Sequence, residues 1–528
     1  MLSRDLQHLA EETFDVLVLG GGINGLATAW DCSLRGLKVA LVEKGDYGGE
    51  TSAASLKIIH GGLRYLQHGD FIRMRESTVE RRSFFRMVPH LVDPFPFLVP
   101  TYGYGLKGKA AMALAMRIND WVSWDRNQGL VDEKKHIPSG QVVDRNAVLR
   151  YAPDVPAEGL TGGAIFYDGR MYNSERVTLS FALSAAAKGA TLANYVCAEQ
   201  LLPDGAEVRD LLSGDTFKIK SRVIVSALGP WTDPFLNQKP VKYSAGMQII
   251  TRAVTREGMG LAVPGAAVDP DAKIDRGGRH YFTTPWRGHT IWGTTDDVYE
   301  GDPAEWRIDD LSVQRFVDEL NQSLPKLALK SEDVIHAYGG LRPLDEKNLN
   351  TGSQVSRKYE IFTHDQPNLL SMVGVKYTAC RVMAEKMTDL VFAKLGREAS
   401  NCKTAETPLI GGNFETMESL CRSVRKNAPE SLKKPKIQHL LRNYGTMAEH
   451  MIAQIKDDPS LGEFVPESEE VLKVQVKHAI EIEGAQTPDD IMLRRTDLGT
   501  LGPINDETRI YCEKALALPT QHQADIDA

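Results

Sequence analysis

The chain has 528 residues, 42% of them hydrophobic and 25% charged, and a formal net charge of -8 at pH 7. This length predicts two or three domains with ample hydrophobic core. The negative charge argues against a general nucleic-acid-binding protein, so an anionic substrate would require a local cluster of Arg and Lys.

Six cysteines are scattered through the chain without a C-x-x-C pair. This spacing indicates neither a zinc site nor a disulfide framework, so we expect no metal centre and a reducing, cytoplasmic location. The first ten residues lack the apolar core of a secretory signal, and no run reaches the about 18 apolar residues of a membrane span.

A short apolar run, Phe14–Leu19, predicts a strand that is buried on both faces of a parallel sheet. Gly20, Gly22 and Gly25 follow at once in a G-x-G-x-x-G pattern. The first glycine permits a tight turn, the second lets the backbone approach a pyrophosphate, and the third lets helix and strand pack closely.

The helix that this pattern requires is predicted over Ile23–Arg35, and Gly36 ends it. Its N-terminal amide groups would point at the pyrophosphate, where the helix dipole favours negative charge. A second buried strand, Leu37–Val42, leads to Glu43, at the distance where an acidic residue binds the adenosine ribose. The segment therefore predicts a dinucleotide site, although the pattern alone does not separate NAD from FAD.

The segment 45–66 is richer in polar and charged side chains than an ordinary connection, and it leaves the tip of the second strand. The overlapping stretch 51–71, TSAASLKIIHGGLRYLQHGDF, resembles the signature T-S-x-x-S-x-K-x-I-H-G-G-x-R-Y-L of FAD-dependent glycerol-3-phosphate dehydrogenases. In that family the signature lines the flavin and the substrate pocket. The resemblance therefore implies FAD as the cofactor.

Further matches to this family are spread along nearly the whole chain. They are SALGPW (226–231), WGTTD (292–296), GGLRPL (339–344), VGVKYTACR (373–381) and RRTDLG (494–499). They imply a mixed α/β fold, with a Rossmann-like FAD-binding domain, an inserted mixed β-sheet substrate domain and a C-terminal α-helical domain. We expect the FAD-binding domain at about 14–100, 174–235 and 333–400 within an oxidoreductase region 1–407, the substrate domain at about 101–173 and 236–332, and the helical domain at 408–528.

Residue patterns support the same architecture. Helical spacing covers Ser174–Lys188 and Thr378–Leu395, and the segment 205–220 alternates like a hairpin that leads into a buried strand at Arg222–Ala227. Strands dominate between Gly246 and Thr295. Short strands are also predicted at Ala190–Val196, Val334–Tyr338 and Leu369–Val373, and amphipathic helices at Leu440–Ile455 and Ser468–Glu481.

Oxidation of a secondary alcohol by a flavin requires a base for the hydroxyl proton and positive charge near the forming carbonyl. We assign the base to His60, since imidazoles titrate near neutral pH; the alternative is a structural histidine beside two glycines. The resemblance implies that Arg342 holds the substrate oxygen, with a structural salt bridge as the alternative, and that Lys376 lies over the flavin or reaches the substrate.

Substrate phosphate would be bound by Arg64 and Arg357, because a planar guanidinium matches phosphate oxygens. Alternatively, Arg357 is an exposed surface residue. Tyr65 is expected to pack beside the substrate, or else to belong to the hydrophobic core. The residues expected to bind the cofactor are Gly20, Gly22, Gly25, Glu43, Thr51, Ser52, Lys57, Gly229, Lys376 and Thr378.

Three departures from the family pattern fall near the expected substrate. Gly246, Met247 and Gln248 stand where G-S-H is usual, so the second histidine is missing. Asn173–Arg176 replaces an acidic D-D-A-R, and Leu228 replaces Thr. The expected reaction is oxidation of sn-glycerol 3-phosphate to dihydroxyacetone phosphate, with hydride passing to flavin N5 and electrons to quinone. Alternatives are another polyol phosphate, such as erythritol phosphate, an amine or amino-acid oxidase, and a flavoprotein without turnover.

The segment Lys107–Trp124 combines basic residues, an apolar middle and two terminal tryptophans. Such a helix could lie in a membrane interface, or it could pack on the protein's own core. The family's dehydrogenases are peripheral membrane enzymes, so the resemblance implies a place on the inner face of the cytoplasmic membrane. A homodimer is a further expectation.

Overall fold

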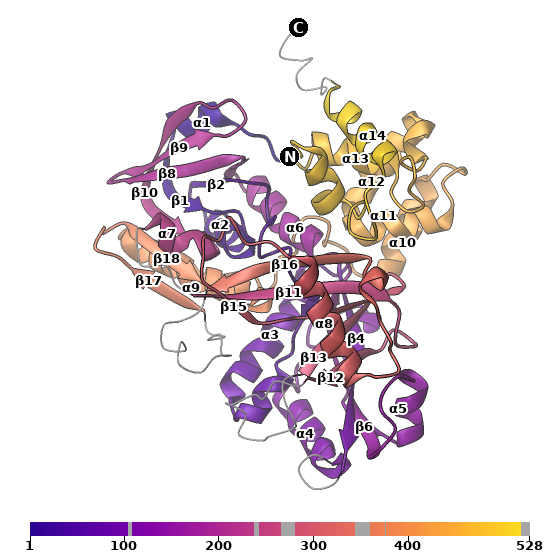
Figure 1. The fold of residues 1–528 in the computed structure, drawn as a ribbon. Helices are drawn as coiled ribbons and strands as arrows, with labels where there is room; N and C mark the ends of the chain where they lie inside the picture. Colours follow the sequence, from indigo (N-terminus) through magenta and orange to yellow (C-terminus); the bar gives the residue numbers. More distant parts are fainter. Residues whose placement is uncertain (104–107, 237–241, 266–279, 344–358, 375, 519–528) are drawn as a thin grey trace. The chain divides into compact units, whose positions relative to one another are not determined.

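A computed structural model describes residues 1–103, 108–236, 242–265, 280–343, 359–374 and 376–518. The chain forms two compact units, each assembled from separate segments (Figure 1). The first unit comprises Met1–Ala53, Asn173–Thr232 and Lys358–Ala528, and the second comprises Ala54–Tyr172 and Asp233–Arg357.

The first unit is built on a mostly parallel sheet, which has eight strands in the described part of the chain. Its main path runs β17 (Glu360–Thr363), β18 (Leu369–Val373), β10 (Thr216–Ser226), β1 (Thr13–Leu19), β2 (Val39–Glu43) and β7 (Thr191–Asn194). The pairs from β18 to β7 are parallel, while β17 pairs with β18 in the antiparallel sense. The predicted hairpin is confirmed, since β9 (Gly205–Asp210) pairs antiparallel with β10 and also with β8 (Val196–Leu202).

Helices pack around this sheet because its central strands are apolar on both faces. The helix α2 (Ile23–Leu34) contacts α6 (Ser174–Ala187) and α9 (Cys380–Lys394). Trp30 meets the ring of Phe181 edge to face, with centroids 5.5 Å apart. All three helices match predicted helices, with ends within two residues of the expected positions. A 3-10 turn, Tyr377–Ala379, precedes α9.

Helices make up the C-terminal part of the first unit. They are α10 (Met417–Asn427), α11 (Lys434–Tyr444), α12 (Ala448–Asp457), α13 (Lys473–Glu481), a π-helical turn (Asp490–Arg495) and α14 (Asp506–Leu516). The prediction of one continuous helix over Leu440–Ile455 is wrong, because the chain breaks at Gly445, whose φ is +54°. A Cβ atom at Gly445 would lie 1.9 Å from the carbonyl oxygen of Gly411, so the break brings two backbones together.

The second unit contains a mixed sheet with ten strands among the described residues. Its main path runs β15 (Asp297–Tyr299), β11 (Tyr243–Arg252), β14 (His289–Gly293), β13 (His280–Trp286), β12 (Gly260–Pro264), β4 (Val92–Tyr102), β6 (Leu160–Met171) and β3 (Ile58–Ile59). Off this path, β16 (His336–Pro343) pairs with β11 and β5 (Gln141–Val143) pairs with β6. The helices of this unit are α3 (Phe71–Met87), α4 (Lys109–Val122), α5 (Arg145–Tyr151) and α8 (Asp310–Ser323).

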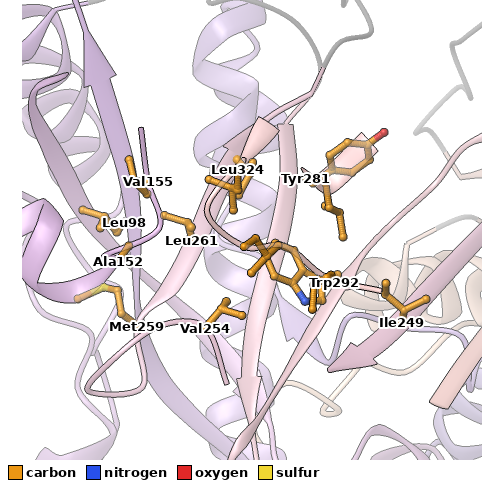
Figure 2. Close-up of a cluster of buried hydrophobic side chains, with 14 of the residues drawn as sticks. Leu98, Ala152, Val155, Ile249, Val254, Met259, Leu261, Tyr281, Trp292 and Leu324 are labelled. Carbon is orange, nitrogen blue, oxygen red and sulfur yellow. The ribbon is translucent and has the colours of Figure 1, made fainter. Parts of the chain in front are cut away.

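An apolar core joins the sheet of the second unit to α5 and α8 (Figure 2). Trp292 on β14 is fully buried there, and its indole nitrogen donates to the hydroxyl of Thr251 over 2.8 Å. Leu261, Val254 and Leu324 pack in the same cluster. Burial of large side chains of this kind contributes most of the stability of such a unit.

The expected mixed α/β architecture is confirmed: the described residues form two sheets and a C-terminal helical region. The strand at 334–338 was expected to belong to the cofactor domain. It lies instead in β16, where the pairing of Gln248 with Tyr338 places it in the ten-stranded sheet. The division into domains at the expected residues stays a prediction.

Candidate functional site

The glycine turn of the first unit joins β1 to α2 without room for side chains. Gly20 has a φ of +102°, and a Cβ atom at this position would lie 2.7 Å from the carbonyl oxygen of Ala227. At Gly25 a Cβ atom would lie 2.0 Å from the carbonyl oxygen of Gly20. The helix therefore approaches the turn as closely as the pattern predicted, and its N-terminus is left facing the end of the sheet.

Glu43 closes over this turn from the tip of β2. Its Oε2 accepts from the amide of Gly21 over 2.6 Å, and its Oε1 accepts from the amide of Gly45 over 2.8 Å. Burial raises the pKa of the Glu43 carboxyl, while the amides of Gly45 and Gly21 act in the opposite direction. An acidic side chain held in this way suits the hydroxyls of a ribose.

Several buried polar atoms near the carboxyl ends of β1 and β10 have no hydrogen-bond partner among the described residues. They are Asn24 Oδ1, Ser226 Oγ, Trp231 Nε1 and Thr232 Oγ1. Buried polar groups in folded proteins are rarely left unpaired. A dinucleotide bound at this edge of the sheet, which is where open parallel sheets bind ligands, would supply the missing partners.

The structure brings most of the expected cofactor residues into this one unit. Ser52 accepts from the amide of Ile23 over 2.9 Å, with Thr51 beside it, and Gly229 begins the turn after β10 with a φ of +54°. Asn24 approaches the carbonyl oxygen of Gly374 at 3.5 Å. This contact puts the segment that carries Lys376 and Thr378 next to the first turn of α2.

Lys57, also expected at the cofactor, lies in the second unit instead. It is 3% exposed with a φ of 56°, and its Nζ lies 4.9 Å from the centre of the Trp286 ring. Its carbonyl oxygen accepts from the amide of Met171. A role for Lys57 at the cofactor stays a prediction.

In the second unit, His60 contacts a buried carboxylate that is itself bound by an arginine. Its Nδ1 lies 3.2 Å from Oδ2 of Asp168, whose Oδ1 accepts from the Gly61 amide over 2.6 Å and from Arg81 Nη1 over 2.7 Å. Asp168 and Arg81 are buried, whereas the side chain of His60 is 51% exposed. The carboxylate of Asp168 thus orients the imidazole through Nδ1.

Neither Asp168 nor Arg81 was singled out from the sequence. Each lies outside the glycine-rich signature, on β6 and α3 respectively. The available signal was an acidic side chain within the apolar strand IFYDGRM, which a buried position would oblige to find a basic partner.

Arg342 lies on β16 and is held by the neighbouring strand and loop. Its Nη2 donates to the carbonyl oxygen of Thr295 over 3.1 Å and lies 3.4 Å from Oδ1 of Asp296. A Cβ atom at Gly246 would lie 2.7 Å from the same Nη2, so the glycine makes room for the guanidinium. The ion pair considered as an alternative for Arg342 is therefore present.

Gln248 lies on the same face of the sheet as Arg342. Cross-strand pairing puts Phe282, Gly293, Gln248 and Tyr338 in one row across four strands. Gln248 is 4% exposed; its Nε2 donates to the Thr294 hydroxyl over 2.7 Å, and its Oε1 has no partner among the described residues. The departure from the family pattern thus places a buried amide oxygen near Arg342.

The predicted phosphate ligands are only partly accounted for. Arg64 and Tyr65 lie in a 3-10 turn, Leu63–His68, which follows Gly62 with its φ of +85°. The guanidinium of Arg73 lies 6.0 Å from the ring centre of Tyr65. Arg357 lies outside the described residues.

Comparison with known families assigns nearly the whole chain. A family model described as FAD dependent oxidoreductase matches residues 15–390, and another, described as the C-terminal domain of alpha-glycerophosphate oxidase, matches residues 402–510. The second match begins close to where helices replace strands.

Individual relatives share the same extent. The glycerol-3-phosphate dehydrogenase of Synechocystis sp. is 32% identical, over 93% of this chain and 90% of that protein. The glycerol-3-phosphate dehydrogenase 2 of Mycobacterium tuberculosis is also 32% identical, over 93% of this chain and 82% of that protein.

A solved structure has the same fold. It is the glycerol-3-phosphate dehydrogenase from Bacillus halodurans complexed with FAD, with a TM-score of 0.73 and 24% identity, covering 98% of this chain and 94% of that chain. The glycine turn, the acid over it and the unpaired buried atoms fit the same cofactor. The chain therefore belongs to the family of FAD-dependent glycerol-3-phosphate dehydrogenases, and its cofactor is FAD.

Proposed function

We propose that the protein oxidises the C2 hydroxyl of sn-glycerol 3-phosphate to give dihydroxyacetone phosphate. When bound, FAD supplies the hydride acceptor at its N5 atom. The hydroxyl proton goes to His60. The electrons then pass to a quinone.

The observation that carries this proposal is the contact of His60 with Asp168. A base that accepts a proton becomes an imidazolium, and a carboxylate 3.2 Å from Nδ1 stabilises that charge. Arg81 and the Gly61 amide fix the carboxylate in turn, so the imidazole is oriented before substrate binds.

The positive charges near the substrate have separate roles in the proposal. Arg342 stabilises negative charge on the forming carbonyl oxygen, Arg64 binds the phosphate together with Arg357, and Lys376 completes the site next to the cofactor. Tyr65 packs beside the substrate. The names of the relatives support a phosphorylated alcohol over an amine as the substrate class.

Gln248 favours a second candidate, a longer polyol phosphate such as erythritol phosphate. Its buried Oε1 accepts no hydrogen bond within the described residues, so an additional substrate hydroxyl would give it a partner. Glycerol 3-phosphate has one hydroxyl fewer than erythritol phosphate that could donate to this oxygen.

With quinone as the electron acceptor, we expect the protein to lie on the membrane surface. No described helix is long and apolar enough to cross a bilayer. The helix α4 packs on its own unit through Met112 and Met116, yet Leu114, Trp121 and Trp124 are 60%, 76% and 73% exposed. Exposed tryptophans are typical of side chains that rest at the headgroup level of a bilayer.

The α4 proposal is tested by co-sedimentation with vesicles of anionic lipid. The Trp121→Ser, Trp124→Ser double variant should leave the vesicle fraction, because it removes apolar area without touching the core. Leu311→Ser, which alters an exposed apolar residue of α8, is the matched control. Equal sedimentation of the double variant and the wild type would contradict membrane docking through α4.

The reaction is tested by anaerobic titration of the flavin absorption band with glycerol 3-phosphate. Rapid bleaching is expected, and erythritol 4-phosphate titrated in parallel decides between the two substrates. Dye reduction without peroxide release then supports the dehydrogenase, whereas peroxide formation would identify oxygen as the acceptor. Failure of both polyol phosphates to bleach the band would overturn the proposed reaction.

A further inference from the structure

The loop between β2 and residue 52 is attached to the glycine turn at three points. Gly21 donates to Glu43, the Gly48 amide donates to the carbonyl oxygen of Gly21 over 2.9 Å, and the Ile23 amide donates to Ser52. A Cβ atom on Gly21 would lie 3.0 Å from the ring of the buried Tyr47. The position of this loop and the shape of the turn therefore depend on each other.

Asp46 attaches the same loop to the C-terminal helical region. Arg495 binds its carboxylate with two hydrogen bonds, Nη1 to Oδ2 over 2.5 Å and Nη2 to Oδ1 over 2.8 Å. Arg494 donates from Nε to Oδ2 over 2.5 Å, and Asn194 adds a bond of 3.1 Å to Oδ1. A carboxylate only three residues after Glu43 thus receives two arginines from the far end of the sequence.

These side chains are buried and their charges are matched. The side chains of Asp46 and Arg495 are both 0% exposed. Burial raises the pKa of Asp46, but the charges of Arg495 and Arg494 outweigh it, and the net pKa lies below the ordinary value. The carboxylate is therefore ionised, and removal of Asp46 or Arg495 would leave the charge of the other buried and less well compensated.

The arginines are themselves fixed from behind. Both belong to the π-helical turn Asp490–Arg495, a geometry that is frequent at functional sites. Arg495 also donates from Nε and Nη2 to the carbonyl oxygen of Glu483, over 3.2 and 3.1 Å, and Arg494 pairs with Asp490. Asp490 in turn accepts from the hydroxyl of Tyr195 over 2.6 Å.

We propose that the C-terminal helical region is part of the FAD site, and that Arg494 and Arg495 are positioning residues for it. By holding Asp46, they keep residues 43–52 against the glycine turn, so that Glu43 and Ser52 meet the cofactor in a preformed arrangement. Loss of the arginine contacts loosens this loop and weakens FAD binding. The inference rests on FAD as the cofactor and does not depend on the substrate.

The test is the dissociation constant of FAD, measured by flavin fluorescence on the full-length apoprotein. Asp46→Asn and Arg495→Gln should each weaken binding by about tenfold or more, whereas Arg495→Lys, which keeps the charge, should recover part of the loss. The double variant Asp46→Asn, Arg495→Gln should lose no more than either single variant, because the two side chains act as one contact.

Glu483→Gln is the matched control. It removes an equally buried carboxylate, which binds Arg176 of α6 over 2.7 Å and makes no side-chain contact with residues 43–52 in the described structure. It should lower the unfolding temperature while changing FAD binding by less than about twofold.

Where the Arg495 variants do not fold, Arg494→Gln decides, since its side chain is 15% exposed and still contacts Asp46. Unchanged FAD affinity in folded Asp46→Asn or Arg494→Gln protein overturns the proposal. A loss in Glu483→Gln equal to that in Asp46→Asn overturns it as well, because general loosening of the helical region would then explain both.

Discussion

Replacing Asp168 by Asn keeps the shape of the side chain and removes the charge beside His60. The cost to catalysis follows from the 3.2 Å separation of Nδ1 and Oδ2. At this distance two unit charges attract by about 5 kcal/mol at an effective dielectric constant of about 20. Because the His60 side chain is 51% exposed, water screens the pair, and roughly 2–3 kcal/mol is the better figure.

This energy corresponds to a loss of roughly 30- to 150-fold in the rate of flavin reduction. The assay is anaerobic stopped-flow bleaching of the flavin band by glycerol 3-phosphate, with variants matched for flavin content. The substitution also leaves the buried Arg81 without its carboxylate, so a fall in unfolding temperature is expected alongside the slower rate.

Asp125→Asn separates the two effects. Asp125 is a buried carboxylate of the same unit that binds Arg75 and Arg82 and does not contact His60 in the described structure. It should lower stability to a similar degree and leave flavin reduction at the wild-type rate. If the Asp168→Asn protein, folded and loaded with FAD, also reduces its flavin at that rate, Asp168 does not support a base at His60.

Three further substitutions test other parts of the molecule. Gln248→His should raise kcat/KM for glycerol 3-phosphate relative to erythritol 4-phosphate by about tenfold if the buried amide selects the substrate; an unchanged ratio would remove it from the substrate site. Gly25→Ala places a Cβ atom 2.0 Å from a carbonyl oxygen, so the purified protein should lack the flavin band, and a full band would refute the need for this close approach. Burial raises the pKa of Glu483, but Arg176 and His478 together outweigh it and the net pKa is about 2, below the ordinary 4.5. This depressed pKa contributes about 3 kcal/mol of stability above pH 4.5, which is lost as the pH falls towards 2. Glu483→Gln should therefore reduce the fall in unfolding temperature between pH 6 and pH 3. The same fall in the variant and the wild type would contradict the depressed pKa.

Local patterns predicted the strand, glycine turn, helix and strand at the start of the first unit well. The glycine turn, the two strands beside it and Glu43 lie within about thirty residues, so the spacing of their residue types carries the geometry. The helix α9 was also predictable, because its apolar residues recur at helical spacing.

Features set by distant partners were not predictable in the same way. Asp168 meets His60 across 108 residues of sequence, and no spacing rule connects them. The break at Gly445 depends on the close approach of Gly411, since a glycine within a helical pattern is otherwise tolerated. Residues 336–343 read as a strand, but only their register with β11 decides which sheet receives them.

The contact between Asp46 and Arg495 spans 449 positions of the chain. At ribosomal speeds of about 5–20 residues per second, the carboxylate emerges roughly 20–90 s before the arginine that neutralises it. During that interval Asp46 lacks both of its arginine partners, and the loop has only its local bonds to the glycine turn. If these arginines position the loop as proposed, the preformed FAD site requires that Arg495 has been made and has reached Asp46.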